Sequence, residues 1–178
     1  MKGFSRTYTT PFKHHIPNYT NEFLKQNSII FRWIKFFKRY LYIFFKKQKS
    51  LEVFKISSRH KNILWINISA SSLGDSLMDL SGRILLKDKR LDLFTDIKNV
   101  HLYKSDNIFK GVYSNLNDIN DINYDLIIID SYSTRSIKVK AKVAPKVSFV
   151  GVFGYFNGPE VNRVLFSFHQ INKLLGYS

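Results

Sequence analysis

Residues 62–75 read NILWINISASSLGD, and this stretch gives the clearest information on the fold. Its first half, residues 62–68, is a short and mostly apolar run, which is typical of a strand buried on both faces. The run ends in a turn of small residues at 69–75, and apolar residues at helical spacing follow over 76–86. The order of strand, small-residue turn and helix predicts the first unit of an α/β fold.

The same alternation continues to the end of the chain. Further strands are predicted at 91–94, near 100–103, at 124–130 and at 147–152, and further helices at 134–143 and 160–175. Alternating strands and helices predict a Rossmann-like parallel sheet over residues 61–178 with helices on both faces. We expect the strands at 62–68 and 124–130 to be adjacent, or nearly so, at its centre.

A parallel sheet of this kind binds ligands at the carboxyl ends of its strands. Here those ends are the loops Ser69–Asp75 and Asp130–Arg135. The first loop combines the hydroxyls of Ser71 and Ser72 with Gly74, which allows close backbone approach, and these features suit an anion or a sugar. Asp75 has two interpretations, a chemical group of the site or an acid that stabilises the first turn of its helix. The chain has neither GxGxxG nor a P-loop, so a dinucleotide or NTPase site is not supported.

The composition fits one domain with an extension. The chain has 178 residues, of which 44% are hydrophobic, and it contains no cysteine. A disulfide scaffold, a cysteine-based zinc site and a thiol nucleophile are therefore excluded. His14 and His15 have no third ligand nearby and are interpreted as solvated, so no metal site is predicted. The first residues lack an apolar segment and a cleavage site, and no signal peptide is predicted.

Positive charge is concentrated in the first third of the chain. Residues 1–60 contain 13 Lys and Arg against 2 Asp and Glu, whereas residues 61–178 contain 15 against 11. We therefore divide the chain into a basic arm, 1–60, and a folded domain, 61–178. An arm of this charge predicts a polyanionic partner: a membrane surface, a nucleic acid or a phosphorylated glycan.

Residues 29–47 of the arm are predicted to form an amphipathic helix. Apolar residues recur at helical spacing along one side: Ile30, Ile34, Phe37, Leu41 and Phe44. Basic residues occupy the opposite side and the flanks, and they are the candidates for contact with a membrane surface: Arg32, Lys35, Lys38, Arg39, Lys46 and Lys47. Four charges between Arg32 and Arg39 exclude a transmembrane span.

Three interpretations of this helix stay open. In the first, the apolar side of the helix packs on the domain and the charged side faces solvent. In the second, the helix lies in the interface of an anionic bilayer, and in the third it binds nucleic acid. The first two are compatible. The third has no accompanying nucleic-acid-binding motif.

The folded domain resembles the lipopolysaccharide heptosyltransferases, glycosyltransferase family 9. Residues 63–83 resemble the opening strand, SxxGD loop and first helix of that family. YDLIIID at 124–130 with Arg135-Ser136 resembles its YDLVIDL…RS stretch, APKVSFVG at 144–151 resembles its APxRIGF strand, and 160–176 resembles the helix that ends its N-terminal domain. The resemblance covers about two-thirds of the chain, and the motifs occur in the same order.

The resemblance implies a GT-B fold, of which this chain is the N-terminal, acceptor-binding half. In that family the aspartate of the SxxGD loop is regarded as the general base of an inverting transfer, and this role falls to Asp75. Arg135 and Lys146 match basic positions that face acceptor phosphates or carboxylates, beside Ser71, Ser72 and Gly74 of the loop. The implied donor is ADP-heptose or a similar nucleotide sugar, no metal is required, and the acceptor is inner-core lipopolysaccharide at the cytoplasmic face of the inner membrane.

The sequence ends where the donor-binding domain of that family begins. We therefore expect a fragment, a half-enzyme that needs a separate donor-binding domain or subunit, or an inactive relative. The alternative to a glycosyltransferase is a non-catalytic basic protein of a membrane surface or an assembly that keeps the fold. Nucleic-acid binding is the third and least supported function.

Overall fold

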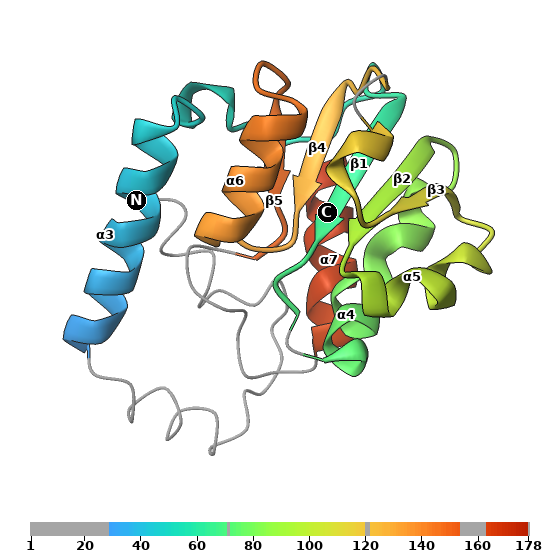
Figure 1. Ribbon diagram of the computed structural model, residues 1–178, viewed down its shortest axis with the longest axis horizontal. Helices are drawn as coiled ribbons and strands as arrows, with labels where there is room; N and C mark the ends of the chain where they lie inside the picture. The colour runs from blue at the N-terminus through green and yellow to red at the C-terminus, as the bar shows by residue number, and fades with distance from the viewer. Residues whose placement is uncertain (1–28, 71, 120–121, 154–162, 178) are drawn as a thin grey trace.

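A five-stranded parallel sheet forms the centre of the computed structural model, which describes residues 29–70, 72–119, 122–153 and 163–177 (Figure 1). Its strands are β1 (Asn62–Asn67), β2 (Arg90–Thr95), β3 (Phe109–Tyr113), β4 (Leu126–Ile129) and β5 (Phe149–Gly151). The strand order is β3-β2-β1-β4-β5, and every pairing is parallel. The predicted Rossmann-like α/β class is confirmed.

The two strands expected at the centre are neighbours. β1 pairs with β4 from Ile63 opposite Leu126 to Ile66 opposite Ile129, and it pairs with β2 on its other side. The first three strands extend the sheet in one direction, and the chain then returns to place β4 and β5 on the other. This reversal makes the gap between the carboxyl ends of β1 and β4 the topological switch point, where ligands bind in open α/β sheets.

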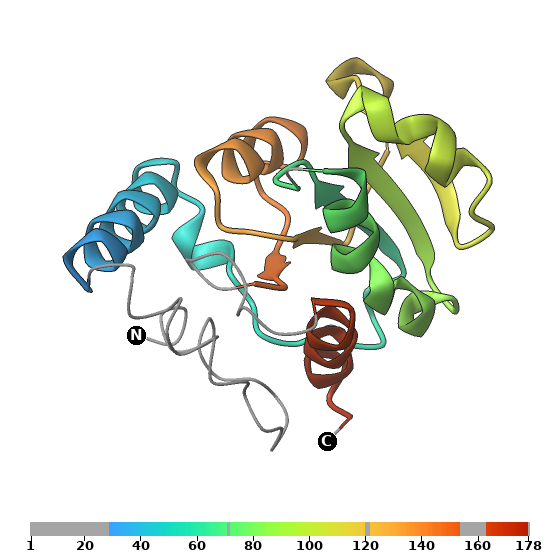
Figure 2. The same ribbon diagram turned by 90° about the horizontal axis from the view of Figure 1, so that it is seen from below.

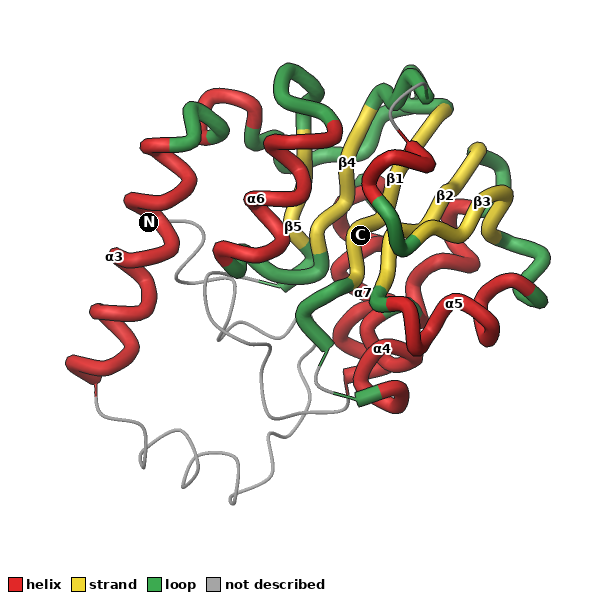
Figure 3. The backbone as a smooth tube through the Cα atoms, viewed as in Figure 1, coloured by secondary structure: helices red, strands yellow, loops and turns green. Residues whose placement is uncertain are grey.

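Helices cover both faces of the sheet (Figures 2 and 3). One face packs against α4 (Leu73–Asp79), the 3₁₀ helix η2 (Ser81–Leu86), α5 (Ile97–Lys104) and α7 (Arg163–Leu175). The other packs against α3 (Ile29–Phe45), the 3₁₀ helix η3 (Leu116–Ile119) and α6 (Thr134–Val143). In β1, Ile63 and Trp65 join the first layer, and Leu64 and Ile66 join the second. Burial on both faces explains the continuous apolar run in the sequence.

One predicted strand is wrong. Residues near 100–103 belong to α5, and the third strand is β3 at 109–113. Neighbouring parallel strands need a crossover between them, so the segment after β2 must cross the sheet before the next strand begins. The buried residues of α5, Asn99 and Tyr103, are one helical turn apart.

The helix predicted at 76–86 begins earlier and is interrupted. α4 starts at Leu73 and ends at Asp79, and η2 continues from Ser81. Gly82 of η2 packs so closely on α7 that an added Cβ would lie 2.6 Å from Cγ1 of Ile171. The helices at 134–143 and 29–47 agree with the predicted bounds to within two residues, and α7 starts at Arg163, since 160–162 lie outside the described residues.

The basic arm packs on the domain with a different side from the predicted one. Phe36 and Ile43 are the buried side chains of α3, and they join the core layer that contains Ile137 of α6. The predicted apolar side points outward instead, and all of its members are exposed: Ile30, Ile34, Phe37, Leu41 and Phe44. The interpretation in which this side packs on the domain is therefore wrong. Apolar residues occupy most of the circumference of α3, so the widest apolar arc did not identify the packing side.

The segment between α3 and β1 also contacts the domain. Gln48 accepts a hydrogen bond from the buried Lys140 of α6. Val53 donates its backbone N–H to the carbonyl of Phe149 at 2.8 Å, and Ile56 donates to that of Leu174 at 2.7 Å. Packing on the domain therefore extends well before the predicted boundary at residue 61. Within the described part of the chain, α3 and the other helices are too short or too polar to cross a membrane.

Candidate functional site

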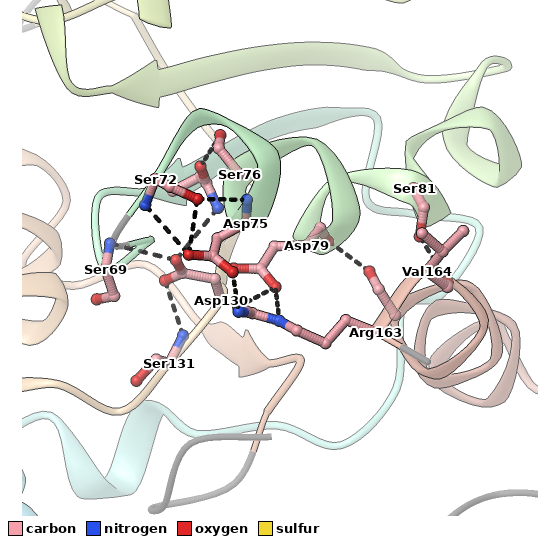
Figure 4. Close-up of polar contacts among 12 residues, drawn as sticks. Ser69, Ser72, Asp75, Ser76, Asp79, Ser81, Asp130, Ser131, Arg163 and Val164 are labelled. Carbon is pink, nitrogen blue, oxygen red and sulfur yellow. Dashed lines mark hydrogen bonds and ion pairs between the residues drawn. The ribbon is translucent and has the colours of Figure 1, made fainter. Parts of the chain in front are cut away.

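Two aspartates of α4 and one arginine of α7 form an ion cluster at the carboxyl edge of the sheet (Figure 4). Arg163 donates from Nη1 to Oδ1 of Asp75 at 2.5 Å. It also donates to Oδ1 of Asp79, from Nη2 at 2.6 Å and from Nε at 3.1 Å. Asp75 and Asp79 are four residues apart, so one helical face presents both carboxylates to the same guanidinium.

The buried end of β5 helps to hold that guanidinium in place. The ring of Phe153, which follows β5, lies 5.8 Å from the Arg163 guanidinium carbon, within cation–π range. Arg163 is about one-third exposed, whereas the Asp79 side chain is only 3% exposed and that of Asp75 19%. Of the three groups, Asp79 is thus the fully desolvated charge, and Asp75 is the carboxylate that faces the surface.

Asp75 also caps its own helix. Ser72 Oγ accepts the backbone N–H of Asp75 at 3.1 Å, and Asp75 Oδ2 accepts the backbone N–H of Ser72 at 3.1 Å. This reciprocal pair is a capping box, and Ser72 Oγ donates to the same carboxylate oxygen at 2.9 Å. The interpretation of Asp75 as an acid that stabilises the first turn of its helix therefore describes the structure, and the same carboxylate lies at the carboxyl edge of the sheet.

A third carboxylate, Asp130, lies beneath this cluster directly after β4. It is fully buried, and its oxygens accept hydrogen bonds from Ser131 N at 2.7 Å, Asn67 Nδ2 at 3.2 Å and Ser69 N at 3.4 Å. Through Asn67 and Ser69 it ties the end of β1 to the end of β4. Asp130 thus holds the two loops of the switch point in a fixed relation.

Burial raises the pKa values of two acids at this edge of the sheet. Desolvation raises the pKa of Asp79 to about 6, with the neighbouring charge of Arg163 opposing the rise and Asp75 adding to it. Desolvation, reinforced by Asp79, raises the pKa of Asp130 to about 7. Both acids therefore titrate near neutral pH, but both are too deeply buried to touch a ligand.

Polar contacts continue from the cluster into the core. Ser76 Oγ donates to Asn67 Oδ1 at 2.5 Å and lies 2.7 Å from the hydroxyl of Tyr103. On the other side, the hydroxyls of Ser69, Ser133 and Ser136 lie within 2.9 Å of one another. These contacts fix the backbone of the loops, so the exposed groups of the site sit on a rigid base.

The predicted loop residues have different positions in the structure. Ser71 lies outside the described residues, Ser72 is the helix cap, and Gly74 is an exposed residue of α4. A Cβ added at Gly74 would meet only Ser72 Oγ, at 3.8 Å. The fold therefore does not need a glycine there, and the close approach that Gly74 allows is available to a ligand.

The two predicted acceptor-binding cations lie at opposite edges of the sheet. Arg135 is at the carboxyl edge, where it donates to the carbonyl of Ile68 at 3.0 Å and pairs with Asp96 after β2. Lys146 precedes β5 and is therefore at the amino edge. Of the two cations, Arg135 therefore lies at the same edge of the sheet as Asp75, and Lys146 does not.

The cations predicted for a membrane surface also divide into two groups. Lys38, Lys46 and Lys47 are exposed, whereas Lys35 and Arg39 are half-buried, and the side chain of Arg32 lies outside the described residues. Burial lowers the pKa of Arg39 to about 10, with the charge of Asp130 acting in the opposite direction. Arg39 thus faces the domain, on the side where Asp130 lies.

Sequence reasoning missed Arg163 and Asp79 as members of the site. The spacing of Asp79 from Asp75 is a helical turn and was a usable signal. Arg163 gave no such signal, because 84 residues separate it from Asp79 and only tertiary packing brings α7 against α4. Asp130 was identified as a strand end, but its burial depends on the helices that cover it.

The chain matches no family model, no curated protein and no solved structure. In the part of the chain that the structure describes, no group of three or more side chains is arranged to hold a metal ion. The geometry of the switch point is therefore the basis for a function.

Proposed function

We propose that this chain is the acceptor-binding domain of an inverting glycosyltransferase of the heptosyltransferase kind. The observation that carries the proposal is the position of Asp75. It is the least buried of three carboxylates at the switch point of a parallel sheet, with a side chain 19% exposed, and it stands beside an exposed glycine that the fold does not require. An inverting transfer needs a carboxylate that takes the proton of the acceptor hydroxyl, and a carboxylate at this edge can act in that way.

In this proposal, Asp75 takes the proton of an acceptor hydroxyl while that oxygen attacks the anomeric carbon of a nucleotide sugar such as ADP-heptose. The bond from that carbon to the diphosphate breaks, and the diphosphate leaves with the bonding electrons. Arg163 orients Asp75 through their ion pair. In the free protein, Oδ2 of Asp75 accepts a hydrogen bond from Ser72 Oγ. In the complex, the acceptor hydroxyl replaces Ser72 Oγ as the donor to this oxygen.

Arg135 supplies the second contact with the acceptor. Its side chain is 62% exposed and lies at the same edge as Asp75. A guanidinium suits the phosphates and carboxylates of inner-core lipopolysaccharide because it binds them with two parallel hydrogen bonds. As part of the same proposal, the protein is peripheral at the cytoplasmic face of the inner membrane, and a donor-binding domain completes the enzyme.

The decisive experiment is acceptor binding by the full chain and by Gly74→Ala. We expect calorimetry with deacylated inner-core lipopolysaccharide to detect binding by the wild type. Gly74→Ala should weaken it at least about tenfold, because a methyl group in the first turn of α4 blocks close approach of the acceptor. Its melting temperature should not fall, since the structure has room for that methyl group. Absence of binding by the wild type, or equal binding by Gly74→Ala, would contradict the proposal.

A non-catalytic role is the second candidate, and one observation favours it. Both carboxylate oxygens of Asp75 already accept hydrogen bonds: Oδ2 accepts two from Ser72, and Oδ1 accepts one from Arg163. This is expected of a residue that only caps its helix. In that case Asp75→Asn should lower the stability of the protein, and the wild type should show no transfer activity when a donor-binding domain is supplied.

A further inference from the structure

The outward side of α3 is an apolar surface bordered by lysines. Its apolar members, which we call the outer face, are Ile30, Ile34, Leu41, Phe44 and Phe45, with exposed fractions between 48% and 75%. Phe37 lies on the same side and is 47% exposed. Side chains of this size are normally scattered on a protein surface, whereas here they follow one another along a single helix.

The inner side of α3 is already used for packing. Phe36 and Ile43 are buried in the layer shared with α6, and Gln48 just beyond the helix accepts a hydrogen bond from Lys140. Figures 1 and 2 both show α3 at the margin of the molecule, next to α6 and away from α5. The helix is therefore fixed to the domain in an orientation that turns the outer face away from it.

The charges around the outer face select its occupant. Residues 29–47 contain six Lys and Arg and no acid, and Lys38, Lys46 and Lys47 are exposed. A second copy of the chain would bring two such faces, from molecules of net charge +15, into contact. A nucleic acid would satisfy the lysines but not the apolar side chains. An anionic bilayer satisfies both, because acyl chains accept the apolar side while headgroup phosphates pair with lysines.

We propose that the outer face of α3 is a membrane-docking surface that lies in the interface of an anionic lipid bilayer. Ile34, Leu41 and Phe44 enter the boundary between headgroups and acyl chains. Lys38 borders the face along the helix, and Lys46 and Lys47 border it at the carboxyl end. Lys35 and Arg39, which are half-buried, take a smaller part. This inference deepens the peripheral membrane association of the proposed function, but it uses a different surface from the switch point.

The test is flotation of the full chain with lipid vesicles in the absence of saccharide and nucleotide. We expect binding to phosphatidylcholine vesicles that contain phosphatidylglycerol, and little binding to phosphatidylcholine alone. High salt should weaken the binding. Ile34→Asn with Leu41→Asn, and separately Lys38→Glu with Lys46→Glu, should each weaken it at least about tenfold. Because all four positions are exposed, the melting temperature should stay near that of the wild type.

Matched controls come from α5, on the other side of the molecule. Ile97 is 79% exposed and Lys98 is exposed, so Ile97→Asn and Lys98→Glu make the same chemical changes away from the outer face. Both should bind vesicles as the wild type does. Equal losses in these controls, no preference for anionic vesicles, or wild-type binding by both α3 variants would overturn the proposal.

Two further outcomes would assign the surface to another occupant and overturn the proposal. One is a wild-type dimer that Ile34→Asn with Leu41→Asn converts to a monomer. The other is binding to duplex DNA that exceeds vesicle binding at equal salt and does not respond to the apolar substitutions. The vesicle experiment contains no acceptor, so it tests the outer face alone. If vesicle binding fails, acceptor binding by the wild type and by Gly74→Ala still tests the proposed function.

Discussion

Arg163, the first described residue of α7, donates two hydrogen bonds to a single oxygen of Asp79 on α4, from Nη2 at 2.6 Å and from Nε at 3.1 Å. Asp79 is buried, so this pair neutralises a charge that water no longer solvates. The same guanidinium reaches Asp75, the proposed base. Both carboxylates of the ion cluster therefore share one cation.

Loss of this cation should destabilise the protein. Arg163→Met leaves Asp79 buried beside Asp75 without its counter-charge, and we expect the free energy of unfolding to fall by about 1–3 kcal/mol. This is less than for a fully buried pair, because Arg163 is one-third exposed. Urea denaturation measures the effect. Arg59→Met, at an exposed arginine, is the control and should change little. An equal loss in both variants would show that the pair contributes nothing specific.

The buried acids predict a stability that falls as pH rises from about 4 to about 7. In the folded state the pKa of Asp79 is raised to about 6 and that of Asp130 to about 7, while both titrate near 3.8 when unfolded. Between these values the folded state binds more protons, so each group contributes a negative slope of stability against pH. His60, with a lowered pKa, contributes a slope of the opposite sign at acid pH.

Denaturation of the wild type and of Asp79→Asn across this pH range measures the Asp79 contribution. The variant should lose part of the negative slope, whereas Asp88→Asn, at an exposed acid, should keep it. Identical slopes in wild type and Asp79→Asn would mean that Asp79 stays ionised in the folded protein.

Two glycines of neighbouring elements should respond to alanine in opposite ways. At Gly82 a Cβ would lie 2.6 Å from Cγ1 and 3.0 Å from Cβ of Ile171, so Gly82→Ala should cost about 1–3 kcal/mol by forcing η2 away from α7. At Gly74 the space is open and the residue is helical, so Gly74→Ala should stabilise by up to about 1 kcal/mol. Thermal denaturation of both variants tests the pair, and the reverse order would contradict the packing of η2 on α7.

Two helix ends make a second matched pair. Lys47 has a φ of 55° after α3, and Gly176 has a φ of 87° after α7. In both places the next residue's N–H bonds back to the helix, Gln48 to Ile43 and Tyr177 to Asn172. Lys47→Gly should stabilise by roughly 1 kcal/mol and Gly176→Ala should destabilise by a similar amount, because only glycine adopts this backbone without strain. Chemical denaturation measures both, and a change of the same sign in the two variants would be inconsistent with these helix ends.

Asp75→Asn separates the proposed base from the helix cap. Asparagine keeps the shape and can still accept the Ser72 N–H, but it cannot take a proton, so turnover in the reconstituted enzyme should fall about 10²-fold or more. Ser72→Ala is the matched control: it removes half of the capping box at about 1 kcal/mol and keeps the carboxylate. The proposal fails if Ser72→Ala lowers turnover as much as Asp75→Asn does.

The sequence by itself determined the α/β class, the central strands and the bounds of α6. The central strands β1 and β4 are mostly apolar on both faces because helices cover both sides of a parallel sheet, and this produces the continuous apolar runs in the sequence. The helical period likewise predicted α3. Such patterns are local, so they are readable without knowing what packs against them.

Tertiary structure alone decided which groups form the site and which side of α3 packs. Arg163 meets Asp79 across 84 residues because α7 lies on α4, and no local pattern records that contact. Asp130 acquires its raised pKa from burial, which the covering elements provide. On α3, periodicity showed that Ile34 and Leu41 share a side, but the domain packs on Phe36 and Ile43, because the burial of a helix face depends on the elements that lie against it and not on the width of its apolar arc.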